Sequence, residues 1–423
     1  MDHREYQARR ANVFSNMKDE SIALLYSGVA KIASEDENHP FVVNKNFYYL
    51  TGIEQEDCVL MLVKNQGERK EYLFIPPFDP VKEKWYGHRL SPEEAGQIAG
   101  LRNVLMANAL EARIHAELNG SYSDFGTIDK AYIDLSPELK VAENTFTTDV
   151  RSTIERAFPA VEVFDARSLV HALRKVKSPA EIAAIKSAIA TTRLGIMAVM
   201  AKAKSGIREY ELANEFFHVI NDDNENNGLA FSSIVAGGAR ACTLHYPNPQ
   251  ATIRPGELVL CDLGARHEYY CGDISRTFPA SKTFSEQQKL IYSIVLGANK
   301  AVANFARPGL TLKELNNFTK EYLASECFEK GLIKSKDDIG RFYYHNVSHH
   351  IGLDTHDPGD REEPLQEGNV ISDEPGLYFA ELGIGVRIED DLLITKNGAE
   401  VLSKDIIKEI DEIETFLGSG ARK

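Results

Sequence analysis

Two segments in the second half of the sequence each place a pair of acidic residues symmetrically about a short polar turn. In LVLCDLGARHEYYCGDISRTF, apolar residues flank a polar turn at residues 265–268, and Asp262 and Asp273 are symmetric about His267 and Glu268. In EPGLYFAELGIGVRIEDDLLIT, Glu374 and Glu389 have the same relation to a second turn. Both patterns predict an antiparallel hairpin, in which directly opposite residues have Cβ atoms about 5 Å apart on one face.

Carboxylates held that close together repel one another, and a divalent cation between them is the usual compensation. A single acid in a strand is more often a solvated, outward-facing residue, and either hairpin alone favours that interpretation. Two such hairpins in one chain favour a metal site instead.

Four histidines lie between the hairpins, in YYHNVSHHIGLDTHD. They are His345, His349, His350 and His356, in a chain that has 12 histidines in all. This density is hard to attribute to core packing. One or more of these imidazoles can complete a mixed carboxylate and nitrogen site for Mn²⁺, Co²⁺ or Zn²⁺.

A chain of 423 residues is too long for one ordinary domain, and we expect two. In LRKVKSPAEIAAIKSAIA, Ser178 is followed by Pro179 and, three residues later, by Glu181. This is a capping box that begins a long amphipathic helix. We therefore place a first domain over residues 1–170 and a second over residues 171–423.

The two predicted domains differ in how helices and strands are ordered. The first mixes short apolar strands with helical stretches, which indicates a small α/β domain. In the second, helical patterns reach to about residue 220, strand patterns cover 232–278, helices follow to about 331, and strands return up to 395. Such segregated runs favour an α+β fold with antiparallel pairing over a doubly wound one.

Charge and cysteine content narrow the class of partner. The formal net charge of −15 disfavours binding to nucleic acid or to an anionic membrane surface, which leaves small or peptidic ligands. The first twenty residues are charged and lack the apolar core of a signal peptide, and no later run of about 18 residues is free of charges. The five cysteines show no CxxC spacing, as expected for reduced thiols. We expect a cytoplasmic location.

Taken together, these motifs resemble one family. The hairpin and histidine segments, with PFVVNKNFYYLTG in the first domain, resemble the proline-specific metallopeptidases of the pita-bread fold, most closely aminopeptidase P. The resemblance covers nearly the whole chain. It implies an α+β pita-bread catalytic domain, an antiparallel sheet flanked by helices, preceded by a smaller α/β N-terminal domain.

The resemblance also implies which residues bind metal. It assigns two divalent ions, Mn²⁺ by preference although Co²⁺ or Zn²⁺ would fit, to four carboxylates and one imidazole, with Asp273 and Glu389 touching both ions. Four carboxylates carry a formal charge that two divalent cations neutralise. The implied ligands are Asp262, Asp273, His349, Glu374 and Glu389.

Further residues are implied in catalysis. Glu374 would also carry the proton to the leaving proline nitrogen, and the residues implied to bind substrate or to stabilise the transition state are His245, His345, His356 and Arg387. Simpler interpretations stay open for some of them. His245 could be an ordinary loop histidine, His356 could pair with a neighbouring aspartate, and Arg387 could form a salt bridge at a strand edge. Trp85, the single tryptophan, is read as a core or surface aromatic.

The implied activity is hydrolysis of the bond between an N-terminal residue and a following proline. The partners would be peptides with proline in the second position, together with further copies of the chain in a dimer or tetramer. Four alternatives remain: a prolidase restricted to Xaa-Pro dipeptides, a methionine aminopeptidase, a non-catalytic pita-bread module that binds proteins, and a creatinase-like amidinohydrolase that keeps the fold without the metals. The long N-terminal region argues against the second of these, and the complete ligand set argues against the third.

Overall fold

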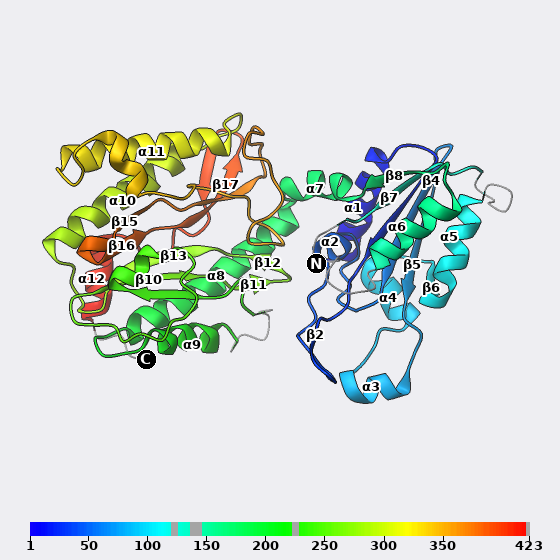
Figure 1. Ribbon diagram of the computed structural model, residues 1–423, viewed down its shortest axis with the longest axis horizontal. Coiled ribbons are helices and arrows are strands. Elements are labelled where there is room, and N and C mark those ends of the chain that lie inside the picture. Colours follow the sequence, from blue (N-terminus) through cyan, green and yellow to red (C-terminus); the bar gives the residue numbers. More distant parts are fainter. Residues whose placement is uncertain (120–125, 136–145, 222–227, 420–423) are drawn as a thin grey trace. The chain divides into compact units, whose positions relative to one another are not determined.

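The computed structural model describes residues 1–119, 126–135, 146–221 and 228–419. The chain divides into two compact units, Met1–Arg174 and Lys175–Lys423 (Figure 1). As predicted, the first unit mixes strands and helices along the chain, and in the second unit helices and strands come in separate runs.

The first unit is a six-stranded mixed sheet with helices. The sheet order is β6-β5-β4-β1-β7-β8; β4 pairs antiparallel with β1 and β5, and the outer pairs are parallel. Ile22, Met61 and Phe74 lie in its buried core. The strands are β1 Ser21–Tyr26, β2 Ile32–Ser34, β3 Glu37–Asn38, β4 Val59–Asn65, β5 Glu68–Ile75, β6 Val104–Met106, β7 Lys130–Ile133 and β8 Glu162–Asp165. The helices are α1 His3–Asn16, α2 Lys45–Thr51, α3 Pro80–Tyr86, α4 Pro92–Ala99, α5 Leu110–Leu118, α6 Phe146–Ala157 and α7 Arg167–Lys175.

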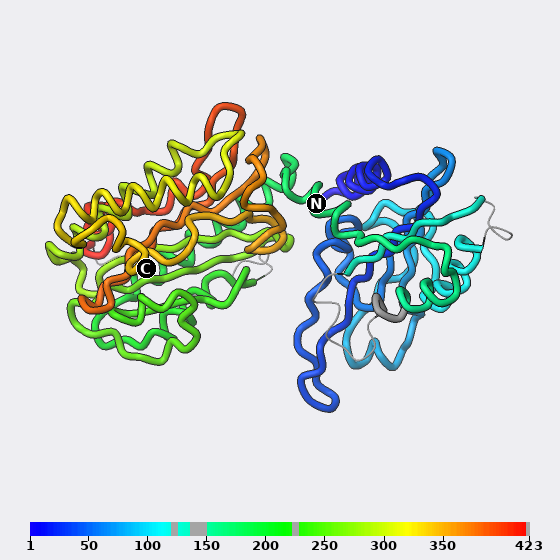
Figure 2. Tube along the Cα trace, turned by 45° about the horizontal axis from the view of Figure 1, so that its top comes forward, coloured from blue at the N-terminus to red at the C-terminus, as the bar shows by residue number. Residues whose placement is uncertain are grey.

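One part of the first unit is unusually exposed. The β2–β3 hairpin extends away from the rest of the unit (Figure 2), and every residue of β2 and β3 is exposed. Helix α3 buries no residue at all. Trp85 in this helix is 72% exposed, so it is a surface aromatic rather than a core residue.

The second unit has helices on both sides of its strands (Figure 1). Helix α8 packs against β11, β12 and β13, α9 packs against β9, and α10 packs against β14, β15, β16 and β18. The helices are α8 Pro179–Lys202, α9 Glu209–Ile220, α10 Glu286–Phe305, α11 Leu312–Glu329 and α12 Ile410–Gly418.

All strand pairs of the second unit in the described residues are antiparallel. The sheets are β13-β10-β9, β14-β17-β18, β11-β12 and β15-β16. This confirms the prediction of an α+β fold with antiparallel pairing. The strands are β9 Ile234–Gly237, β10 Leu258–Leu263, β11 Arg266–His267, β12 Tyr270–Cys271, β13 Ile274–Pro279, β14 Val370–Asp373, β15 Gly376–Phe379, β16 Ile384–Arg387, β17 Asp390–Thr395 and β18 Gly398–Val401.

Helix α8 begins with the predicted capping box. The Ser178 hydroxyl accepts from the Glu181 N–H, and the Glu181 carboxylate accepts from the Ser178 N–H. By length and composition α8 is apolar enough to cross a membrane. Its residues Ile185, Ile189 and others are buried inside the unit, against α9 and the β10–β13 hairpin. It has the packing of a core helix.

The first hairpin has a different register from the predicted one. Asp262 lies opposite Ser275, not opposite Asp273, so that prediction is wrong. The turn is centred on Glu268 and Tyr269, one residue later than expected, with φ of 47° and 66°. Turns with positive φ at both central residues usually carry Asn or Gly there. Glu and Tyr occupy these positions here, so the sequence did not reveal the position of the turn. Because the shift moves the partner by two residues, both aspartates keep the same face.

The second hairpin has the predicted register. Asp373 lies opposite Asp390 on one side of the acids, and Gly376 lies opposite Arg387 on the other. Glu374 and Glu389 fall at matching positions between these two ladders, which confirms their predicted symmetry.

A fully buried arginine joins the two hairpins. Arg276 of β13 donates through Nη1 to the Glu389 carbonyl at 2.6 Å and through Nη2 to an Asp390 carboxylate oxygen at 2.9 Å. Its remaining donors reach the carbonyls of Ser275, Ile406 and Ile407. Since Lys408 also pairs with Asp390, the charge of this aspartate is compensated without water.

Replacing Arg276 by methionine leaves the buried Asp390 carboxylate and the Glu389 carbonyl short of donors. Removal of one partner from a buried ion pair costs about 3–5 kcal/mol, and we expect the free energy of unfolding to fall by that amount in a urea titration. Lys289→Met removes a more exposed ion pair with Glu414 and should cost less than about 1 kcal/mol. Equal losses in the two variants would contradict this account.

Candidate metal centre

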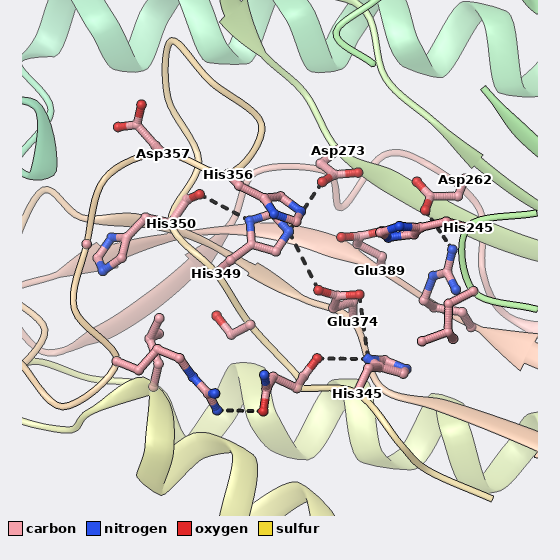
Figure 3. Close-up of a pocket in the computed structure, with 17 residues that line it drawn as sticks. His245, Asp262, Asp273, His345, His349, His350, His356, Asp357, Glu374 and Glu389 are labelled. Carbon is pink, nitrogen blue, oxygen red and sulfur yellow. Dashed lines mark hydrogen bonds and ion pairs between the residues drawn. The ribbon is translucent and has the colours of Figure 1, made fainter. Parts of the chain in front are cut away.

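The predicted ligands line one cavity of the second unit, with a volume of about 400 Å³. Asp262, Asp273, His349, Glu374 and Glu389 all face it, and Figure 3 shows the His349 ring between Asp273 and Glu374. The acids come from the two hairpins, and the histidine comes from the loop between α11 and β14. The cavity therefore collects side chains that are far apart in the sequence.

Three of these side chains converge most tightly. One ligand atom from each of Asp273, His349 and Glu389 lies within 4.8 Å of the other two. The His349 Nε2 is 3.5 Å from an Asp273 oxygen and 3.6 Å from a Glu374 oxygen. Because ligand atoms bind such metals at about 2.0–2.2 Å, atoms that share an ion lie about 3–3.5 Å apart. The spacing fits a shared cation.

Backbone and hydroxyl contacts fix the acids in place. The Ser275 hydroxyl donates to the Glu389 carboxylate at 2.7 Å, and the Glu389 N–H donates to the Ser275 carbonyl at 3.1 Å. The Asp273 N–H donates to the Asp391 carboxylate at 3.2 Å. Two of the acids are thus held by partners from the opposite hairpin.

His349, the predicted histidine ligand, is held by β14. The His349 N–H donates to the Ser372 hydroxyl, and the Ser372 N–H donates to the His349 carbonyl, both at 2.9 Å. The ring Nδ1 lies 3.1 Å from the His350 carbonyl. When Nδ1 carries the proton, Nε2 is left as an acceptor toward the acids, as a metal ligand requires.

Asp262 is paired with Arg387 rather than with the central cluster. The Arg387 Nη2 is 2.6 Å from Asp262 Oδ2, its Nε donates to the Ser275 hydroxyl, and its Nη1 reaches the Tyr378 hydroxyl at 3.2 Å. The predicted alternative of a strand-edge salt bridge therefore describes one real contact. Arg387 is nevertheless buried and lines the cavity.

Burial and mutual repulsion raise the pKa values of the acids. Burial raises the pKa of Asp262 and of Glu374 to about 7, and the neighbouring Asp273 adds to both shifts. Burial, then Asp273 and Glu374, raise the pKa of Glu389 well above its usual range. Burial alone would lower the pKa of His349, but Asp273 and Glu374 raise it to about 9. The cavity is short of positive charge.

A second observation is consistent with a cation bound by these residues. Asp262 Oδ1 is buried and has no hydrogen-bond partner among the described residues. A buried polar atom without a partner is costly unless something compensates it. Oxygen atoms of this kind, next to an imidazole, form the donor set that Mn²⁺, Co²⁺ or Zn²⁺ accept.

The other predicted histidines also line the cavity. The His345 Nε2 is 2.8 Å from the Tyr378 hydroxyl, and its Nδ1 is 3.8 Å from Glu374. The His356 ring packs on the His349 ring with centroids 4.1 Å apart. His245 is exposed, in the loop after β9. All the predicted residues therefore share one site.

Sequence reasoning missed several residues of this site. The Tyr378 hydroxyl lies between His345 and Arg387, Ser275 holds Glu389, and Asp391 holds the Asp273 backbone. The run of acids after Arg387, in RIEDD, was a signal for Asp391. Nothing in the sequence distinguished Tyr378 or Ser275 from the other residues of their strands.

Two family models match this chain. Residues 183–396 match the model for metallopeptidase family M24, and residues 6–124 match the N-terminal domain of aminopeptidase P. The chain belongs to the aminopeptidase P group of metallopeptidase family M24. With this assignment, the pita-bread fold expected for the second unit is established.

Individual relatives match along their whole length. The chain is 33% identical to the Xaa-Pro aminopeptidase of Haemophilus influenzae, over 98% of this chain and 97% of the relative. A solved structure of Escherichia coli aminopeptidase P with the inhibitor Pro-Leu has a TM-score of 0.91 at 30% identity, and covers 100% of both chains. A Bacillus anthracis structure provisionally assigned as an aminopeptidase P gives a TM-score of 0.95 at 40% identity, with 99% of each chain covered.

Metal removal provides the first test of the site. A ligand that binds only the folded state at 100 times its Kd stabilises it by about 2.7 kcal/mol, so chelation should lower Tm and added Mn²⁺ should restore it. Asp273→Asn should abolish the restoration and lower the bound metal measured by mass spectrometry. The exposed Asp405 offers a matched control, since Asp405→Asn should bind metal normally. Undiminished metal in Asp273→Asn would refute the assignment.

Proposed function

We propose that this protein is a dinuclear-metal Xaa-Pro aminopeptidase, which hydrolyses the bond between an N-terminal residue and a following proline. The observation that carries the proposal is the co-location of four carboxylates and a histidine in the cavity of an M24 fold. The full-length similarity to Xaa-Pro aminopeptidases of Haemophilus influenzae and Escherichia coli supports the substrate class.

Five residues would hold the metal ions: Asp262, Asp273, His349, Glu374 and Glu389. We propose Mn²⁺ because oxygen ligands predominate; a zinc-substituted Escherichia coli aminopeptidase P has also been solved. When bound, such ions polarise the substrate carbonyl and make water a nucleophile near neutral pH.

The chain's own residues would then handle the proton and the developing charge. Glu374 faces the cavity beside His349 and is proposed to take the proton from water and deliver it to the proline nitrogen, because a tertiary amide nitrogen leaves only when protonated. His345 is fixed by the Tyr378 hydroxyl, and Arg387 is fixed by Asp262. Such preorganised donors stabilise charge in the transition state without reorganising.

His245 and His356 are proposed to contact the substrate. His245 lies in a loop and is exposed toward the cavity, and His356 lies over the His349 ring. Both side chains are exposed, so a peptide in the cavity can reach their rings. This separates them from His345, which is largely buried.

Self-association and a cytoplasmic location belong to the same proposal. Exposed apolar side chains gather on α3 and just before it, at Phe78, Val81, Trp85 and Tyr86. A surface of this kind is typical of a protein contact, and a dimer or tetramer would cover it. All five cysteines are in the thiol form, which agrees with a reducing compartment.

Activity is tested by removing metal, restoring Mn²⁺, and assaying an Xaa-Pro dipeptide beside an Xaa-Pro-Yaa tripeptide. We expect cleavage of the tripeptide at the Xaa-Pro bond, with release of Xaa. Asp273→Asn should lower kcat/KM by at least about 10³-fold, because the metal-bound state is lost. Zn²⁺ and Co²⁺ run in parallel decide which ion supports turnover.

The assay also separates the alternatives. Cleavage of the dipeptide alone would make the protein a prolidase. Stoichiometric metal without cleavage of either peptide would refute the substrate assignment, and a protein purified gently without metal would point to a binding module.

Self-association is tested by light scattering after size-exclusion chromatography. We expect the wild type to be a dimer or tetramer, and Val81→Ser with Trp85→Ser to shift it to smaller species, because both side chains are more than half exposed. Phe328→Ser, at an exposed position of α11, should leave the mass unchanged. A monomeric wild type would end this part of the proposal.

A further inference from the structure

A buried ion pair links the segment before α8 to the histidine loop of the cavity. The Lys177 Nζ is 3.0 Å from Asp357 Oδ2, and both side chains are only 1% exposed. Lysine is rarely buried to this degree unless it is paired. The capping box that follows Lys177 marks the start of α8, but the roles proposed above use neither Lys177 nor Asp357.

The position of Lys177 is set by its backbone. Its N–H donates to the Gly368 carbonyl at 2.8 Å, and the Asn369 amide donates to the Lys175 carbonyl at 2.9 Å. Lys175 also pairs with Glu363 at 2.5 Å. The backbone around Lys177 is therefore fixed to the residues that lead into β14. This also fixes the ammonium group that pairs with Asp357.

The helix that follows is fixed to the other side of the site. Glu181 closes the capping box with one carboxylate oxygen and accepts the Tyr270 hydroxyl at 2.9 Å with the other. Tyr270 belongs to the hairpin that supplies Asp262 and Asp273. Glu181 in the first turn of α8 thus contacts the acidic hairpin, and Lys177 just before the helix contacts the histidine loop.

Asp357 is packed tightly into its loop. Its N–H donates to the His350 carbonyl at 2.9 Å, and its Oδ1 accepts from the Asp354 N–H at 3.3 Å. A Cβ on Gly352 would lie 2.4 Å from Asp357 Oδ2, so glycine leaves the room that the carboxylate occupies. The loop closes around this one side chain.

The next residue back along the chain is His356, whose ring packs on His349 at 4.1 Å. His356 is exposed, and its position follows from the backbone on which it stands. That backbone is anchored on one side by Asp357. Displacement of a positioned group by about 1 Å can cost 10²-fold in rate.

We propose that Lys177 is a positioning residue, which holds the His356 ring over the metal centre by its buried ion pair with Asp357. The inference rests on the proposed function, since it gives His356 a part in the reaction. It adds a residue from the start of α8 to a site otherwise built from the hairpins and loops.

A mutant cycle tests the proposal. Lys177→Met, His356→Ala and the double variant are compared in kcat/KM for the tripeptide, with metal content measured in each. Lys177→Met should lower kcat/KM by about 10-fold to 10²-fold at unchanged metal content, and Lys177→Arg should recover most of the loss. In the His356→Ala background the same change should have an effect of less than about 2-fold.

Lys186, on α8, which begins just after Lys177, forms an exposed pair with Glu400, and the control variant Lys186→Met should leave kcat/KM unchanged. An equal loss from Lys177→Met in both backgrounds, or a loss that follows metal content, would mean a structural role only and would overturn the proposal. If Lys177→Met does not fold, Asp357→Asn, which keeps the shape of the side chain, replaces it in the cycle.

A second readout does not need activity. In a crystal structure of metal-free Lys177→Met or Asp357→Asn, the His356 ring should leave its place 4.1 Å from His349. An unmoved ring would refute the proposal even if the protein is an active peptidase. A displaced ring in a protein whose wild type cleaves no Xaa-Pro peptide would uphold the positioning role and refute the function.

Discussion

Repulsion among the four carboxylates of the cavity is the constraint on which the second unit depends. Asp262, Asp273, Glu374 and Glu389 are brought into one partly buried space, where burial already disfavours their charged forms. Arg387 offsets part of this charge through Asp262, and His349 lies between two of the others. Bound divalent cations would compensate the remaining negative charge, so the proposed ions would both stabilise the site and supply its chemistry.

Next to the cavity lies another buried carboxylate, Asp390, whose charge is compensated by protein side chains. Asp390 follows Glu389 directly and is paired with both Arg276 and Lys408. Burial alone would raise the pKa of Asp390, but these two cations hold it well below its usual range. Arg276 and Lys408 thus compensate Asp390 without entering the cavity, which stays accessible to metal and substrate.

Much of this organisation could be predicted from the sequence, because it rests on local patterns. The capping box of α8, the antiparallel pairing and the symmetry of Glu374 and Glu389 follow from neighbours in the sequence and are confirmed. The register of the first hairpin was wrong by two residues because positive φ at Glu268 and Tyr269 has no sign in residue type. The partners of Lys177 and Arg276 were also out of reach, since each pairs with residues more than 100 positions away.

The site is made of both hairpins at once, and this has a consequence for how the protein matures. The proposed ligands run from Asp262 to Glu389, and Glu389 is held by Ser275 of the other hairpin. A nascent chain that has left the ribosome only as far as the first hairpin carries two of the acids but neither the histidine nor their opposite partners. The complete set of five proposed ligands therefore exists only once the second hairpin has been synthesised.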